Sequence, residues 1–357
     1  MRDRLVYIDA LRALAILFIV FGHLPMYAYG EAHRELISVR SFTSMVQIPL
    51  FFFISGFLYS TKWIKEHNNR TAECCGNRIG GGKIFYLYAL GKRLLIPILV
   101  WGMIYCTWQK IPYMQAVVDM YKAGYWFTFT LFEFYIMQML LELIARRFAI
   151  TNRSLKYILM GLGVSVVSYL FLLPLVTDSL GIFSGLLGVK QMHYYFFFFL
   201  GILVRIYLYD FKRCKYKEQV MAGITLLFVG LAVSYWIIGA QFSGVWFHAL
   251  WILFQMTGLL LLFAFFYHNR NFFIGGRKIP VVMSYIGQRT LDIYLLHYFF
   301  LPKDLYLFGS YFVAHEAIVI EALFAGIVTF TIVAECAVCS ELLRRSRIIR
   351  DWLLGGK

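Results

Sequence analysis

The chain has 357 residues, of which 61% are hydrophobic and only 15% are charged, and its mean hydropathy is +0.69. Soluble domains are about half apolar and about a quarter charged, so this composition excludes an ordinary soluble protein and predicts a polytopic membrane protein. A net charge of +15 would suggest nucleic acid in a soluble chain, but Lys and Arg collect on the cytoplasmic side of membrane proteins, so we expect no nucleic-acid partner.

Ten apolar segments are long enough to span a bilayer. We therefore predict an all-α polytopic membrane protein with about ten transmembrane helices in one bundle. The chain is then a single membrane domain over 1–357, with a core at about 5–340 and a basic cytoplasmic tail at 341–357. The ten segments are 5–27, 46–63, 93–110, 125–145, 155–176, 193–209, 219–239, 246–267, 281–302 and 316–340.

The distribution of Lys and Arg predicts the orientation. If the N-terminus lies inside, the outer segments carry only six of these residues, and the inner segments carry most of the others. This asymmetry places both termini in the cytoplasm. The longest loop, 62–92, is basic and contains glycines, which favours a flexible cytoplasmic connection. The six outer residues are Arg34, Arg40, Lys110, Lys122, Lys190 and Lys303.

The first segment carries Asp9, Arg12 and His23. Ionisable residues inside a bilayer cost several kcal/mol unless they are paired, hydrated or placed in a cavity, so we expect a use for them. Arg12 and His23 are separated by about three helical turns, which puts them on nearly the same side of one helix and about 16 Å apart along its axis. Asp9 and Arg12 are spaced to pair on one helix face. The structural alternatives are a snorkelling ion pair for Arg12 and an interhelical hydrogen bond for His23.

The second and ninth segments also contain polar residues. Ser55 precedes a glycine, which allows close helix approach, and its hydroxyl can bond a backbone carbonyl or a ligand. The ninth segment places Arg289, Asp292 and His297 within one span. Intramembrane charges normally face a bundle interior, so we hypothesise that Asp292 neutralises Arg12 or Arg289 across helices.

The cysteines do not suggest a metal site. Cys74, Cys75 and Cys214 fall in loops that we place in the cytoplasm, a reducing compartment. Cys336 and Cys339 have the spacing of half a zinc site, but no second ligand pair lies nearby in the sequence, so we expect no metal.

Six motifs, taken in order, resemble the acyltransferase-3 family of integral membrane acyltransferases over nearly the whole chain. The sequence departs from the family pattern before Pro97, where many members carry a second arginine and this chain has Leu94 and Leu95. The motifs are Asp9-x2-Arg12-x10-His23, the stretch from Phe52 to Phe57, Lys92-Arg93-Leu-Leu-Ile-Pro97, Trp126-Phe127, Phe199-Leu-Gly201 with Arg205, and Leu291-x2-Tyr294-x2-His297.

The resemblance implies an enzyme that transfers acyl groups other than amino-acyl groups, commonly acetyl from acetyl-CoA. The expected acceptor is a hydroxyl of a cell-envelope sugar or a lipid-linked glycan, and the expected location is the bacterial plasma (inner) membrane. Acyl-CoA would be a co-substrate, and no permanently bound cofactor is expected. By the same likeness His23 matches the essential histidine of the family and Arg12 its partner arginine.

Basic residues at the inner face would attract the anionic CoA. The candidates are Arg12, Lys92 and Arg93, with Arg205 a weaker one. The neutral imidazole of His23 can deprotonate a sugar hydroxyl at physiological pH, or it can carry the acyl group transiently, and the sequence leaves both open.

Three further side chains are candidates to orient His23 or to stabilise the oxyanion: Ser55, Tyr294 and His297.

Two other functions compete with this one. Buried charges, including Glu133 and Glu321, would also suit a multi-helix transporter of an anionic solute, although the sequence shows no clear half-to-half repeat. A non-catalytic helper of polysaccharide export is the third possibility.

Overall fold

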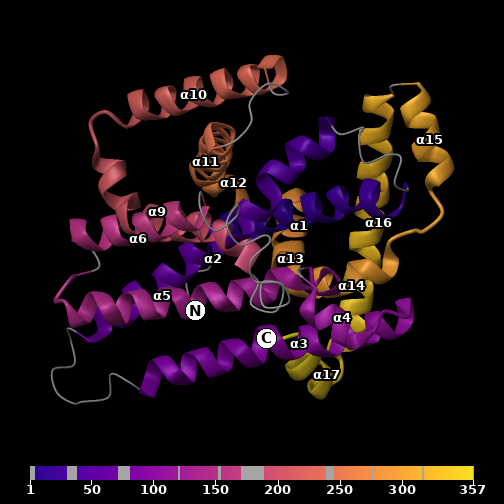
Figure 1. Cartoon of the computed structure of the whole chain (residues 1–357), viewed down its shortest axis with the longest axis horizontal. Helices are drawn as coiled ribbons and strands as arrows, with labels where there is room; N and C mark the ends of the chain where they lie inside the picture. The colour runs from indigo at the N-terminus through magenta and orange to yellow at the C-terminus, as the bar shows by residue number, and fades with distance from the viewer. Residues whose placement is uncertain are drawn as a thin grey trace. The chain divides into compact units, whose positions relative to one another are not determined.

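In a computed structural model the chain folds into helices, and the part of it that the structure describes contains no strand (Figure 1). The all-α prediction is confirmed for these residues. The described residues are 5–29, 38–70, 81–119, 121–151, 154–169, 189–238, 245–274, 276–315 and 317–356.

The helical elements follow one another through all of these ranges. Their bounds are α1 (Val6–Tyr27), α2 (Ser38–Arg70), α3 (Gly81–Gln109), α4 (Tyr113–Val118), η2 (Lys122–Gly124), α5 (Trp126–Arg147), α6 (Leu155–Val167), η4 (Val189–Tyr194), α9 (Tyr195–Arg213), α10 (Lys217–Ile238), α11 (Val245–His268), α12 (Arg270–Ile274), α13 (Lys278–Gln288), α14 (Thr290–Phe300), α15 (Tyr306–Ala314), α16 (Ile318–Arg344) and α17 (Arg347–Leu353).

Among the described residues, seven helices are long and apolar enough to cross a membrane, which confirms the polytopic membrane class. The apolar parts of α2 and α6, Met45–Ser60 and Leu155–Val167, are shorter than this limit. Residues 170–176 of the fifth predicted segment lie outside the described part of the chain. The count of ten spans and the orientation of the termini stay predictions.

The ninth predicted segment is two helices and not one. α13 ends at Gln288, α14 begins at Thr290, and Arg289 between them has φ −97° and ψ 11°. The hydroxyl of Thr290 donates to the carbonyl of Gly287 at 3.3 Å, a side-chain bond that competes with the helical ladder. The apolar pattern continues through this break, so hydropathy alone predicts a single span.

Several segments that we expected to be loops are helical. Helices α2 and α3 extend into the loop predicted at 62–92, and its residues 71–80 lie outside the described part. α15 lies between the ninth and tenth predicted spans, and α17 lies in the predicted tail. Both are too short to span a bilayer, so a search for spans passes over them.

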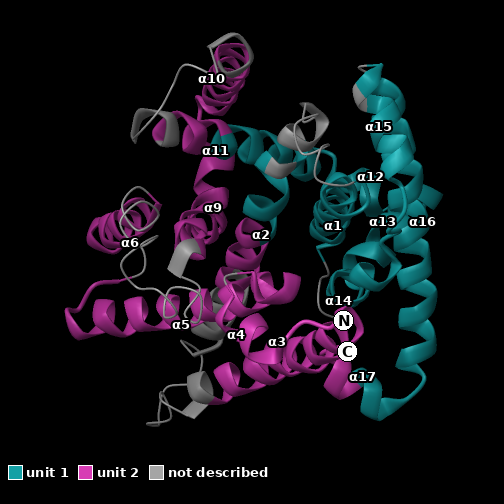
Figure 2. Ribbon diagram, turned by 45° about the vertical axis from the view of Figure 1, so that its right-hand side comes forward, with its two compact units in different colours: residues 1–51, 255–350 teal, residues 52–254, 351–357 magenta. Residues whose placement is uncertain are grey.

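Two compact units are distinguished by their internal contacts (Figure 2). Unit 1 consists of Met1–Phe51 and Gln255–Arg350. Unit 2 consists of Phe52–Phe254 and Asp351–Lys357. The boundaries fall inside α2, α11 and α17.

In unit 1, α1 packs on α12, α13, α14 and α16, and Figure 2 shows it beside α12 and α13. Ala10 and Ala13 are completely buried, and such small side chains let membrane helices approach closely. The approach is closest at Gly287 of α13, where a Cβ atom would overlap the backbone carbonyl of Asp9. The two backbones are therefore in direct contact, and this contact fixes α1 relative to α13.

In unit 2, α2 and α9 also cross with their backbones in contact. A Cβ atom on Gly56 would overlap the carbonyl of Phe198, and one on Gly201 would overlap that of Phe53. The close helix approach predicted at the Ser-Gly pair is confirmed. The side chains of Phe53 and Phe198 are completely buried at this crossing.

Unit 2 also holds a buried polar network centred on Gln138 of α5. Its amide nitrogen donates to the Tyr157 hydroxyl at 2.5 Å and to the Glu142 carboxylate at 3.3 Å. The Tyr195 hydroxyl donates to its amide oxygen at 2.8 Å, and the Tyr59 hydroxyl donates to Glu142 at 2.8 Å. Hydrogen bonding on both sides of the amide ties α2, α5, α6 and α9 together.

Candidate active site

The imidazoles of His23 and His297 meet in unit 1. Nδ1 of His23 on α1 lies 3.0 Å from Nε2 of His297 on α14. The ring planes differ by only 11°, and their centroids are 5.1 Å apart. This separation is close to the nitrogen–nitrogen distance plus the radii of both rings, so the rings meet edge to edge with nearly parallel planes. The two facing nitrogens lie at the distance of a hydrogen bond.

His297 is held in place by its own helix. Its side chain is 0% exposed, and its Nδ1 lies 2.8 Å from the carbonyl oxygen of Tyr294 and 3.1 Å from that of Ile293. The ring therefore bonds to its helix on one edge and to His23 on the other. Tyr294 was a candidate to orient His23 or to stabilise the oxyanion, and its ring lies 6.0 Å from the His297 ring between centroids.

Two more tyrosines surround the histidine pair. The ring of Tyr298 lies 5.3 Å from the His23 ring and 4.1 Å from the His297 ring, between centroids. The ring of Tyr27 lies 5.5 Å from that of His23, and Tyr27 is exposed. Aromatic walls of this kind give the pair an apolar surround, while His23 itself is only half-buried.

Arg12 contacts the same helix, α14. Its guanidinium donates to the hydroxyl of Thr290 at 2.5 Å. Arg12 and His23 thus both point from α1 toward α14, as their eleven-residue spacing predicts. Asp9 is buried one turn before Arg12, at 9% exposure, and its pairing with Arg12 stays a prediction.

Asp292 has a different partner from the two that we hypothesised. Arg344 of α16 binds both of its carboxylate oxygens, from Nε at 2.7 Å and from a terminal nitrogen at 2.9 Å. The hydroxyl of Ser340 donates to the same carboxylate at 2.5 Å. Arg289 pairs instead with Glu341, also on α16. The sequence could not show that α16 is the helix beside the start of α14, so the partner was predicted wrongly.

A polar residue that the sequence did not single out is Gln47 of α2, also in unit 1, which lies beside the residue that precedes His23. It packs against Gly22, since a Cβ atom there would lie 2.8 Å from the Gln47 amide oxygen. That oxygen is buried and makes no hydrogen bond to any described residue. The sequence did not indicate Gln47 as a site residue, because it lies outside every motif.

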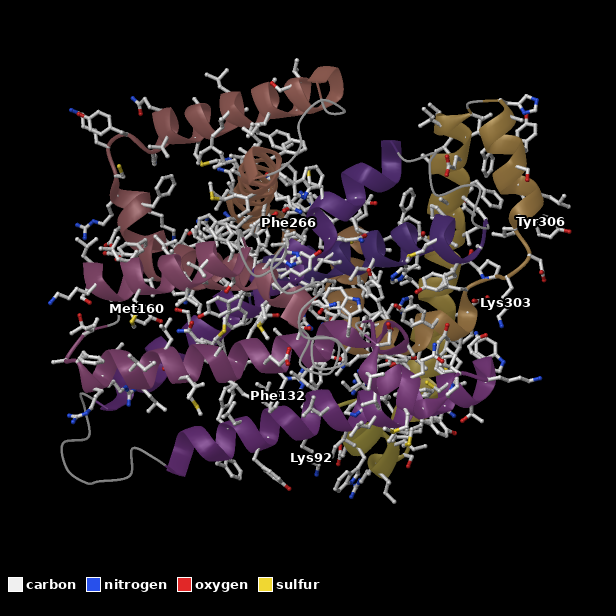
Figure 3. All side chains as sticks on the ribbon, viewed as in Figure 1. Lys92, Phe132, Met160, Phe266, Lys303 and Tyr306 are labelled. Carbon is white, nitrogen blue, oxygen red and sulfur yellow. The ribbon has the colours of Figure 1, made fainter. Side chains whose placement is uncertain are left out.

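The other predicted residues belong to unit 2. Lys92 of α3, labelled in Figure 3, lies with its Nζ 3.7 Å from the ring centre of Trp352. The Trp101 indole donates to the carbonyl of Leu353 at 2.9 Å, so the end of the chain packs on α3. Trp352 was not among the predicted site residues, because nothing in the tail sequence indicates its contact with Lys92.

Three further candidate residues in unit 2 are half-buried, each on the helix that contains its motif. Arg93 follows Lys92 on α3, Ser55 lies on α2, and Arg205 of α9 lies 5.3 Å from the ring centre of Phe57. All three residues belong to unit 2.

The glutamates of the transporter alternative lie apart from the histidine pair in the sequence. One carboxylate oxygen of Glu133, on α5, is buried without a hydrogen-bond partner among the described residues. Glu321, on α16, is buried near Tyr29, which follows α1. Burial and this carboxylate raise the pKa of the Tyr29 hydroxyl, so it stays protonated.

In the described part of the chain, no group of three or more His, Cys, Asp or Glu side chains is arranged to hold a metal ion. An imidazole pair can accept and hold a proton, and a guanidinium on the same helix can bind an anion.

A family model described as an acyltransferase domain matches residues 5–338. No curated protein and no solved structure matches the chain.

Proposed function

Because the chain belongs to the acyltransferase-3 family over nearly its whole length, we propose that it transfers an acyl group, acetyl from acetyl-CoA, to a hydroxyl of a cell-envelope sugar or lipid-linked glycan. Its apolar helices and its family make it an integral membrane acyltransferase. We place it in the bacterial plasma membrane with both termini in the cytoplasm, where CoA is found.

The observation that carries this proposal is the contact between His23 and His297 inside a membrane domain of this family. A histidine can act as general base near neutral pH, and a hydrogen-bonded neighbour orients it for the task. The acceptor hydroxyl loses its proton to His23 while its oxygen attacks the thioester carbonyl. The alternative step, in which His23 carries the acyl group between donor and acceptor, uses the same side chain.

Arg12 supplies the positive charge at the other end of α1. A guanidinium binds phosphate in a fixed fork geometry, so Arg12 is suited to the anionic end of CoA. Lys92, Arg93 and Arg205 add positive charge that attracts the same donor. The distance of about 16 Å from Arg12 to His23 along the helix is comparable with the reach of a pantetheine arm.

The test uses the full chain in proteoliposomes, with radiolabelled acetyl-CoA and envelope glycans from cells that lack the chain. We expect label in the glycan fraction with the native chain, and a loss of at least about 10²-fold with His23→Ala. Arg12→Ala should mainly raise KM for acetyl-CoA. The control is His315→Ala, because His315 is an exposed histidine on the segment after α15. Near-native transfer by a folded His23→Ala protein would remove His23 from the reaction.

A transporter of an anionic solute is the second candidate, and the break between α13 and α14 favours it, because discontinuous helices line many transport sites. The same proteoliposomes distinguish the two functions. Uptake of a labelled anion without any glycan labelling would support transport over transfer.

A further inference from the structure

The hydrogen bonds of His297 determine which of its nitrogens carries a proton. Its Nδ1 lies within hydrogen-bond distance of two backbone carbonyl oxygens, those of Ile293 and Tyr294. A carbonyl oxygen can only accept a hydrogen bond. Nδ1 of His297 must therefore be the N–H group, shared between the two carbonyls.

The burial of His297 determines the state of its other nitrogen. The side chain is completely buried, and it contacts no carboxylate among the described residues. A buried charge without a counter-charge is expensive, so His297 is neutral and its Nε2 carries a lone pair. That lone pair faces Nδ1 of His23 at 3.0 Å. Nδ1 of His23 must then be the donor.

We propose that His297 is a positioning residue that holds His23 in the tautomer with the proton on Nδ1, and so makes Nε2 of His23 the reacting nitrogen. The inference rests on the proposed acyl transfer. It goes beyond that function because it assigns the reacting atom and the direction of the hydrogen bond between His297 and His23.

The transfer step balances with this assignment. The acceptor O–H gives its proton to Nε2 of His23, the acceptor oxygen forms a bond to the thioester carbonyl carbon, and the carbon–sulfur bond breaks. The proton on Nε2 then passes to the departing CoA thiolate, which leaves as the thiol. While both nitrogens of His23 carry protons, the Nδ1–H bond to His297 has a charged donor, and charged hydrogen bonds are stronger than neutral ones.

The groups around the pair suit this role. Three of the rings that face the two histidines belong to Tyr27, Tyr294 and Tyr298. A tyrosine hydroxyl is neutral at physiological pH, so these side chains add no charge that would change the hydrogen-bond direction.

The kinetic test compares three variants in the radiolabelled acetyl-CoA assay. His297→Leu removes the acceptor for His23, and we expect kcat to fall about 10²-fold with KM for acetyl-CoA little changed. His297→Gln returns an acceptor oxygen, and we expect it to recover at least about tenfold of that loss. His315→Leu is the matched control, because Nδ1 of His315 also lies near a helix carbonyl, that of Tyr311 at 2.9 Å, but His315 is exposed.

The spectroscopic test needs no change at His297. Nitrogen NMR of the histidine-labelled full chain, with the His23 signals identified by their loss in His23→Ala, should show Nδ1 protonated and Nε2 unprotonated. A proton on Nε2 of His23, or an unchanged kcat in folded His297→Leu protein, overturns the inference. If the native chain transfers no acyl group, the proposed function fails, and the NMR result still decides the tautomer.

Discussion

Replacing Gly287 with alanine should push α1 away from α13. The added Cβ atom overlaps the backbone carbonyl of Asp9, and a backbone atom cannot rotate out of the way as a side chain can. Cβ atoms essentially never lie within 3.0 Å of such a neighbour. The two helices must therefore separate by roughly 1 Å, and overpacking of this kind costs about 1–3 kcal/mol of stability.

The displacement falls directly on the candidate active site. Arg12 lies one turn after Asp9, and Thr290 lies one turn after Gly287, so the 2.5 Å bond between Arg12 and Thr290 spans the same crossing. A lengthening of roughly 1 Å takes this contact to the limit of a hydrogen bond. Because a misplacement of about 1 Å can cost a factor of about 10² in rate, we expect kcat/KM to fall by about that factor.

The measurements are thermal unfolding in detergent and transfer from radiolabelled acetyl-CoA in proteoliposomes. The matched control is Gly326→Ala on α16 in the same unit, where the added Cβ atom meets nothing within 4 Å. In mid-helix this change should be neutral or slightly stabilising, because alanine is the better helix former. If Gly287→Ala matches Gly326→Ala in both Tm and activity, the backbone contact does not set the geometry of the site.

Three further predictions concern charge and hydrogen bonding. Asp292→Asn removes the carboxylate charge that the guanidinium of Arg344, only 9% exposed, binds through two nitrogens, and should cost about 3–5 kcal/mol; adding Arg344→Gln should restore part of the Tm, and no change in Tm for either would contradict a buried ion pair. Gln138→Leu removes the hydrogen bonds that Gln138 makes to Tyr157 and Tyr195 and should cost about 2 kcal/mol or more in thermal unfolding, whereas an unchanged Tm would show that the network adds no stability. Lys92→Ala should raise KM for acetyl-CoA at constant kcat, and an unaltered KM would remove Lys92 from donor binding. Trp352→Ala removes the ring that Lys92 contacts and should lower the free energy of unfolding by about 0.5–1 kcal/mol.

The sequence predicted the features that depend on one helix at a time. Apolar length gave the membrane class, and helical spacing put Arg12 and His23 on one side of α1. The third feature, the close helix approach at the Ser-Gly pair, depends only on the missing side chain of Gly56. These features follow from the geometry of a single helix, and the spacing of residues along the sequence determines that geometry.

Features that depend on which helices are neighbours were missed or wrong. The partner of Asp292 is Arg344, 52 positions away, and no periodicity connects them. The break at Arg289 was missed because it interrupts the backbone and not the hydrophobic pattern. His297 was a candidate only by its motif, and its bond to His23 required the packing of α14 on α1.

The two bonds between α1 and α14 have a consequence for donor choice. They anchor Arg12 and His23 to the same partner helix at both ends of a stretch whose length is set by helical rise. In the proposed reaction the distance along α1 from Arg12 to His23 determines which donors can react. A donor whose anionic end binds Arg12 places its thioester at His23 only if its arm matches that distance. A truncated donor such as an acetylated cysteamine, which lacks the nucleotide, would lose turnover as well as affinity, because distant binding energy positions the reacting carbon. The spacing on α1 therefore discriminates among donors first by the length of the arm and only then by the acyl group.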